Sequence, residues 1–206
     1  MEPTQQQLEQ VLPSMAANGD HWKPTRNGEE ARKKGAEIME LISRRSRYIL
    51  PPSEHELMSN IGGKDRLLLW FGLFYKRMME DPRMAVLFDA RHEETNVSAA
   101  QHGRRLALAF WSRWTGDDSY YDEVGADADV FQRLQEGHQR AKKCPMRSKK
   151  LRGGSFTTAQ RDSWLGHLWY AGEECGIQVP VRDGIVQHIA TVIDLYGPFV
   201  QDDQYA

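Results

Sequence analysis

Apolar side chains recur with the period of an α-helix along most of this chain, and this pattern limits its fold more than any other feature. The clearest stripe consists of Leu67, Phe71, Phe74, Tyr75 and Met78. It stops before Pro82, because a proline ring cannot continue a helix. No segment alternates convincingly with the period of two that a half-buried strand requires. The sequence therefore predicts an all-α protein.

Several other segments show the same helical period. They cover approximately residues 29–49, 99–114, 130–141, 157–175 and 181–196. Thr157 or Thr158 can cap the fourth of these segments, and Gly176 can end it. Because each segment carries an apolar face, we expect the helices to pack around a shared core.

The length and composition of the chain indicate one domain with appendages. Its 206 residues are 40% hydrophobic, which is enough for one sizeable core and argues against two full domains. We expect an N-terminal extension with one amphipathic helix at 1–53, a helical domain at 54–201 and a tail at 202–206. The net charge of −2 gives no overall basic field, so any binding of nucleic acid would be local.

The sequence indicates neither a membrane span nor a secretory signal. Its most apolar stretch, residues 67–74, is interrupted by Gly72 and is too short to cross a bilayer. The two cysteines, Cys144 and Cys175, show neither metal-site spacing nor a disulfide framework. We therefore expect a soluble cytoplasmic protein, with an organellar matrix as the alternative location.

Two histidines lie on the apolar faces of two different predicted helices. His102 belongs to the segment 99–114 and His138 to the segment 130–141. With the inward-facing Tyr75 and several tryptophans, they are the residue types that a haem pocket requires. One imidazole would bind the iron and the other groups would control the opposite face. A buried histidine is more often a core residue than a ligand, so the residues alone leave both interpretations open.

Several short motifs follow one another between Ile61 and Val200. They are Phe74-Tyr75, Glu80-Asp81-Pro82, Leu87-Phe88, the segment from Trp114 to Tyr120, the segment from Leu134 to Gln139, and the segment from Phe156 to Leu165. In this order and spacing they resemble truncated haemoglobins, closest to group II. The segment from Trp114 to Tyr120 lacks the first glycine and the proline of the family's signature at that place.

The resemblance implies a globin-like, two-over-two helical sandwich around haem b, which is iron protoporphyrin IX. It implies that His138 is the proximal iron ligand. His102 would lie on the distal side, where it either faces the iron or becomes a second ligand. The other implied pocket residues are Tyr75, Phe88, Leu106 and Trp164. Tyr75 and Trp164 would donate hydrogen bonds to a bound ligand, and Phe88 would pack on the porphyrin.

The resemblance also implies a function, which is the binding of dioxygen (O2) or nitric oxide (NO). The family's associated activity is the dioxygenation of nitric oxide to nitrate. If His102 binds the iron, redox or nitric-oxide chemistry is favoured over oxygen storage. The sequence shows no flavin or reductase domain, so turnover would need an external reductant. No nucleophile–base or phosphate-loop motif is present, which sets aside a helical hydrolase or transferase.

A basic insertion at about 140–155 departs from the family pattern next to the expected iron ligand. It allows a second alignment, in which Lys150 takes the place of the proximal histidine. Lysine binds a metal only when neutral, which a basic, glycine-rich stretch does not favour. Of His138 and Lys150, we prefer His138 as the proximal ligand, because only this one of the two lies on a helical apolar face. If Lys150 marks the site, the simplest consequence is a globin without haem.

The basic run at 140–152 has two interpretations of its own. It is either a solvated loop or a docking site for a protein or RNA partner. The second interpretation suggests an alternative function for the whole chain. The protein would then be a haem-less, globin-fold structural subunit of a larger complex, attached through its N-terminal arm and its basic loop.

Overall fold

The computed structural model describes residues 27–44, 51–85, 87, 99–117, 142–143, 152–194 and 197–201. Within these ranges every regular element is a helix, and only an isolated bridge between Thr157 and Val200 has β geometry. The prediction of an all-α chain is therefore confirmed for the part that the structure describes. None of its helices combines the length and apolar character needed to cross a membrane.

The long helices fall on periodic segments of the sequence, but the helix predicted at 29–49 ends at Ser43, and three short elements fall on no predicted segment. The described elements are α2 (Gly28–Ser43), α3 (Glu54–Glu56), the π-helix η1 (Leu57–Ile61), α4 (Gly63–Glu80), α5 (Pro82–Ala85), α6 (Ala99–Thr115), α9 (Thr158–Glu174) and α10 (Val179–Asp194). α4 ends directly before Pro82, as its stripe predicts. The predicted helix at 130–141 lies outside the described residues.

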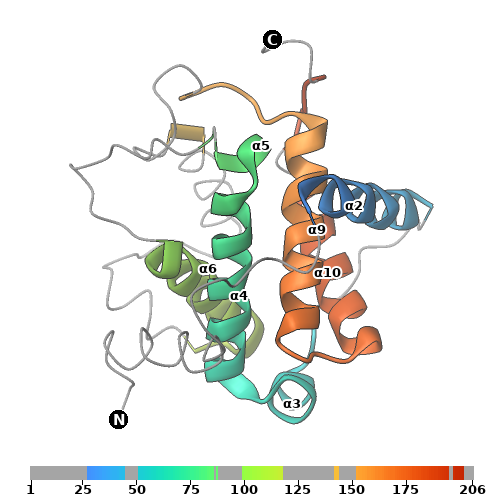
Figure 1. Ribbon diagram of the computed structural model, residues 1–206. Coiled ribbons are helices and arrows are strands. Elements are labelled where there is room, and N and C mark those ends of the chain that lie inside the picture. The colour runs from blue at the N-terminus through green and yellow to red at the C-terminus, as the bar shows by residue number, and fades with distance from the viewer. Residues whose placement is uncertain are drawn as a thin grey trace.

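The long helices α4 and α6 form one pair and α9 and α10 a second, and α2 crosses the second pair (Figure 1). α6 packs beside α4, and α10 packs beside α9. α4 also packs against α9, which joins the two pairs. α2 lies across α9, and these two helices make the most extensive contact between any two described elements.

Local signals in the sequence fix where several helices begin and end. Asn27, Ser53 and Thr157 each accept a hydrogen bond from a backbone N–H one turn later, and the side chain of that later residue returns the contact. Each such cap contributes about 1 kcal/mol to helix stability. The structure thus selects Thr157 over Thr158 as the cap of α9. That helix ends before Gly176, whose φ of +71° suits a residue without a side chain.

The core lies where α4 meets α9 and α6. Trp70, Phe71 and Phe74 of α4 are completely buried. The indole Nε1 of Trp70 donates a hydrogen bond of 2.8 Å to the carbonyl oxygen of Leu168 in α9. This bond satisfies the polar atom of a fully buried tryptophan, and it also fixes the axial position of α4 against α9.

Two glycines allow α2 and α9 to touch backbone to backbone. A Cβ at Gly35 of α2 would overlap the carbonyl group of Asp162, and one at Gly166 of α9 would overlap that of Ala31. The sequence places α2 in the N-terminal extension and does not reveal this crossing. The first described helix is therefore packed directly on the helical domain that follows it.

We expect Gly166→Ala to destabilise the protein by about 1–3 kcal/mol, because the added methyl group forces two backbones apart. Gly184→Ala in α10 is the matched control, since nothing lies within 4 Å of a Cβ at that position. The control should be neutral or stabilising by about 0.5–1 kcal/mol, the helix propensity difference between alanine and glycine. Urea unfolding followed by circular dichroism measures both. Equal stability of the two variants would contradict the proposed contact.

Candidate functional site

Three of the expected pocket residues lie in one aromatic cluster, which we define as Phe74, Tyr75, His102 and Trp164. Tyr75 projects from α4 and His102 from α6, and their rings are stacked with centroids 5.5 Å apart and planes inclined by 17°. Both side chains are partly buried. The structure therefore brings together a phenol and an imidazole from two helices.

Phe74 connects this stack to Trp164 of α9. Its ring meets that of Trp164 edge to face, with centroids 4.7 Å apart, and meets that of Tyr75 in the same manner at 5.1 Å. Phe74 is completely buried, whereas Trp164 is partly buried and packs against the core. Edge-to-face contacts of this kind contribute about 0.5–1.5 kcal/mol each beyond area burial. The cluster is therefore held in place by the core itself.

A glycine beside His102 explains why the imidazole reaches Tyr75. A Cβ at Gly103 would lie 2.6 Å from the carbonyl oxygen of Phe71, closer than real Cβ atoms approach an oxygen. Gly103 thus lets α6 approach α4 closely. Leu106, one turn after His102, is also partly buried and packs against the core.

The environment of His102 favours its neutral form. Burial lowers the pKa of the imidazole, and the positive charge of Arg105 on the same helix lowers it further. A pKa below the usual value of 6.5 leaves the ring largely uncharged at neutral pH. A neutral imidazole can accept a hydrogen bond or bind a metal ion through a ring nitrogen.

Two of the six expected pocket residues, Phe88 and His138, lie outside the described residues. So do Lys150, Cys144 and most of the basic insertion. Cys175 is buried at the end of α9, and burial raises the pKa of its thiol to about 12. This cysteine is therefore an unreactive core residue at neutral pH.

The sequence does not reveal a buried polar cluster between α4 and α9. From its apolar periodicity, the sequence predicts only that a helix ends at Asp81 and that His167 has a structural role in the helix at 157–175. In the fold, Nε2 of His167 lies 2.8 Å from Oδ2 of Asp81, and the two side chains are only 2% and 3% exposed. Beside them, Arg77 of α4 and Glu174 of α9 form an ion pair. The only sign of this cluster in the sequence is that polar residues interrupt the apolar faces of the two helices.

The Asp81–His167 pair consists of a carboxylate and a neutral imidazole. Burial lowers the pKa of His167, although its hydrogen bond to Asp81 opposes this effect. Burial alone would raise the pKa of Asp81, but hydrogen bonds from His167 and from the backbone N–H of Arg83 hold it below its usual value. In this state Nε2–H of His167 donates to the carboxylate.

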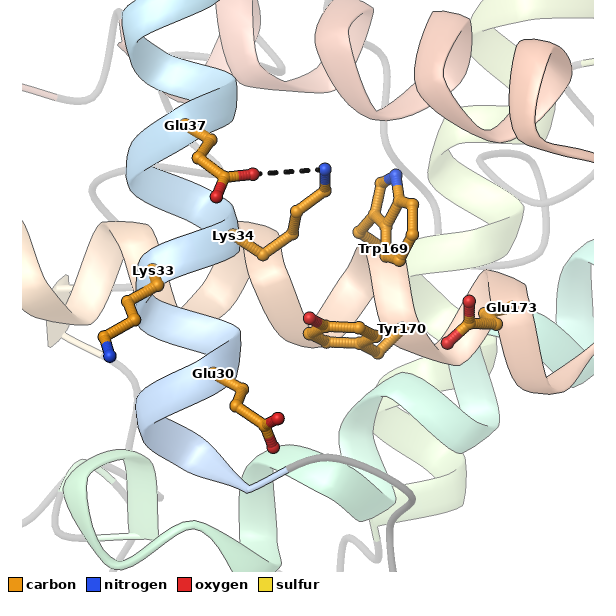
Figure 2. A pocket seen from close by; sticks show the side chains of 7 residues that line it. All are labelled: Glu30, Lys33, Lys34, Glu37, Trp169, Tyr170 and Glu173. Carbon is orange, nitrogen blue, oxygen red and sulfur yellow. Dashed lines mark hydrogen bonds and ion pairs between the residues drawn. The ribbon is translucent and has the colours of Figure 1, made fainter.

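A shallow groove of about 320 Å³ lies between α2 and α9 (Figure 2). It is lined by Glu30, Lys33, Lys34, Glu37, Trp169, Tyr170 and Glu173. The ammonium group of Lys34 lies 3.3 Å from Glu37 and 4.5 Å from the centre of the Trp169 ring. Trp169 is only partly buried, unlike Trp70, Trp111 and Trp114 in the core. The groove is a surface of paired charges, well separated in the chain from the cluster residues Tyr75 and His102.

Comparison with protein-family models, with curated proteins and with solved structures found no match for this chain. Within the described ranges, no group of three or more His, Cys, Asp or Glu side chains could hold a metal ion. The function is therefore inferred from the aromatic cluster and from the motifs in the sequence.

We expect the imidazole of His102 to titrate below pH 6.5 and Arg105→Gln to raise its pKa, because the substitution removes a nearby positive charge. Arg104→Gln is the matched control, since it removes the same charge two residues after His102, and side chains at that spacing on a helix do not face each other. Proton NMR of the imidazole ring measures all three proteins. A His102 pKa at or above 6.5 in the unmodified protein would show that the ring is not buried against Tyr75.

Proposed function

We propose that this protein is a haem-binding truncated globin that binds dioxygen or nitric oxide. The observation that carries the proposal is the aromatic cluster, in which Tyr75 of α4 stacks on His102 of α6, and Phe74, the residue before Tyr75, meets Trp164 of α9. The motifs of the sequence assign these three polar rings to the distal side of a haem pocket. The stack of Tyr75 on His102 supports this assignment for these two residues, and Trp164 is joined to them through Phe74.

The arrangement of the helices also supports the proposal. α4 pairs with α6, α9 pairs with α10, and α4 packs on α9. A two-over-two globin sandwich needs two such pairs, with the ligand site where they meet. The cluster belongs to α4, α6 and α9, so it draws on both pairs.

The residues of the cluster fit a haem group in their chemistry. Its side chains are aromatic rings with a few polar groups, the mixture of residue types that lines cofactor sites. His102 is a neutral imidazole, which is the state that binds iron. Haem takes only one or two axial ligands from the protein, so a cluster of carboxylates and cysteines is not required.

Each side chain has a definite role in this proposal. Haem b would supply an iron centre that takes a diatomic ligand. The O–H of Tyr75 and the indole N–H of Trp164 would donate hydrogen bonds to a ligand that carries partial negative charge. His138 would be the proximal ligand and Phe88 would pack on the porphyrin, although both lie outside the described residues.

His102 decides between two modes of action. If it stays stacked on Tyr75, it leaves the distal side to an external ligand, and the protein retains oxygen. If it were instead a second ligand of the iron, nitric-oxide dioxygenation or redox sensing would be favoured, with electrons from an external reductant. The stacked position of His102 supports the first mode, the retention of oxygen.

The alternative function is that of a haem-less structural subunit in a larger complex. The backbone contact of α2 with α9 favours this alternative, because it anchors the N-terminal extension firmly to the domain. An extension fixed in this way can serve as an attachment point for another subunit of the complex. The basic run at 140–152 would then be the second attachment point, for a protein or for RNA.

We expect the protein, when expressed with a supply of haem, to carry near-stoichiometric haem with a Soret band in its absorption spectrum. His138→Ala should abolish haem retention, because it removes the proximal ligand, whereas Lys150→Ala should leave retention intact. Absorption spectra before and after dithionite measure both. Haem loss from Lys150→Ala with retention in His138→Ala would reverse the assignment. A folded, helical protein that stays colourless after haem addition would favour the structural-subunit alternative.

We expect Tyr75→Phe and Trp164→Phe each to speed the dissociation of dioxygen by about 5–10-fold, because each removes one hydrogen bond of about 1 kcal/mol. Trp169→Phe is the control, since this tryptophan lines the surface groove and should leave the rate unchanged. Laser photolysis or stopped-flow displacement measures the rates. Unchanged rates in both pocket variants would show that neither side chain contacts the ligand.

A further inference from the structure

The buried Asp81–His167 pair lies directly beneath the start of α2. A Cβ at Gly28, the first residue of α2, would overlap the carboxylate of Asp81. Next to it, Glu29 of α2 forms an ion pair of 2.7 Å with Arg83 of α5. α2 therefore rests on the same carboxylate that His167 holds.

α2 also rests on the part of α9 that carries His167. The residue before it, Gly166, is the one whose Cβ would overlap the backbone of Ala31 in α2. Because His167 follows Gly166 directly, a movement of α9 that releases His167 also disturbs this contact with α2. Because the helices touch through backbone atoms, no flexible side chain can absorb such a movement.

The geometry of His167 makes its protonated form costly. Nε2 is bound to Asp81, whereas the buried Nδ1 has no hydrogen-bond partner among the described residues. In the neutral ring Nδ1 is an unmatched acceptor, which costs less than an unmatched donor on a charged ring. In the charged ring it becomes a buried N–H donor with nothing to receive it.

We propose that the Asp81–His167 pair is an acid-sensitive latch that holds α2 against α9 and the α4–α5 junction. At neutral pH the uncharged imidazole stays in the core and the latch is closed. On acidification the protonated ring leaves its buried position, Asp81 loses its donor, and α2 detaches locally. The latch acts on the packing of α2 and operates with or without haem.

The charged groups around His167 are few and most are paired. Asp81 and Arg77 act on it from the end of α4, and Glu174 acts from its own helix. Arg77 is already paired with Glu174. In the neighbouring helices, Glu29 of α2 pairs with Arg83. The buried Arg182 of α10 lies 3.7 Å from Glu173. Among the described residues, Asp81 is thus the one carboxylate whose hydrogen bond depends on the state of the His167 ring.

The sign of the pH dependence follows from the lowered pKa of His167. The open state releases the ring to water, where its pKa is about 6.5. The closed state binds the proton less readily, so its advantage is complete above pH 6.5 and is lost as the pH falls toward the lower pKa of the closed state. Asp81 does not oppose this trend, because its pKa lies below its usual value of 3.8.

We test the latch by hydrogen exchange of the intact chain, measured by mass spectrometry between pH 7.5 and 5. The protection of α2, corrected for intrinsic exchange, should fall by up to about 30-fold, the limit for one group with an exposed pKa near 6.5. The protection of α10 should change much less. His167→Gln should remove most of the pH dependence in α2, because an amide can donate to Asp81 but does not titrate.

His55→Gln is the matched control, since His55 is exposed on α3 and should leave the pH dependence of α2 intact. If His167→Gln fails to fold, an NMR titration of His167 in the unmodified protein replaces it. That titration should follow the same pH curve as the protection of α2. A parallel loss of protection in α2 and α10, an unaltered pH dependence in a folded His167→Gln variant, or a constant protection of α2 would each overturn the latch.

Discussion

The backbone contact between α2 and α9 is the constraint on which much of the structure depends. Gly35 and Gly166 let the two helices approach until only backbone atoms separate them. α9 also packs against α4 and α10, so its buried residues lie on several sides of the helix. A helix enclosed in this way has little freedom to rotate or slide. It therefore provides a fixed frame for the side chains that it carries.

Two side chains of α9 belong to the two sites proposed above. Trp164 extends to the aromatic cluster and meets Phe74, while His167, nearly one turn later, meets Asp81. The cluster and the buried polar pair thus share one rigid helix. A change in the seating of α9 would therefore be felt at both places, which relates the proposed acid-sensitive latch to the proposed ligand site.

Burial of polar groups explains why this region is so highly connected. A buried charge is tolerated only when it is paired. Removing one partner leaves the other buried and uncompensated, at a large cost in desolvation free energy. Arg77 with Glu174 and Asp81 with His167 satisfy this requirement between α4 and α9. Such pairs contribute less to net stability than to a unique alignment of the two helices, since a shifted register would separate the partners.

The sequence by itself determined the long helices among the described residues, because the period of apolar residues and signals such as Thr157 and Pro82 act over a few positions. It also marked Tyr75, His102 and Trp164 as pocket candidates, although it could not show that they meet. Only the tertiary structure decided the crossing at Gly35, the stack of Tyr75 on His102, and the Asp81–His167 pair. Those contacts join residues far apart in the chain, and no local period or spacing encodes which distant side chain will face a given one.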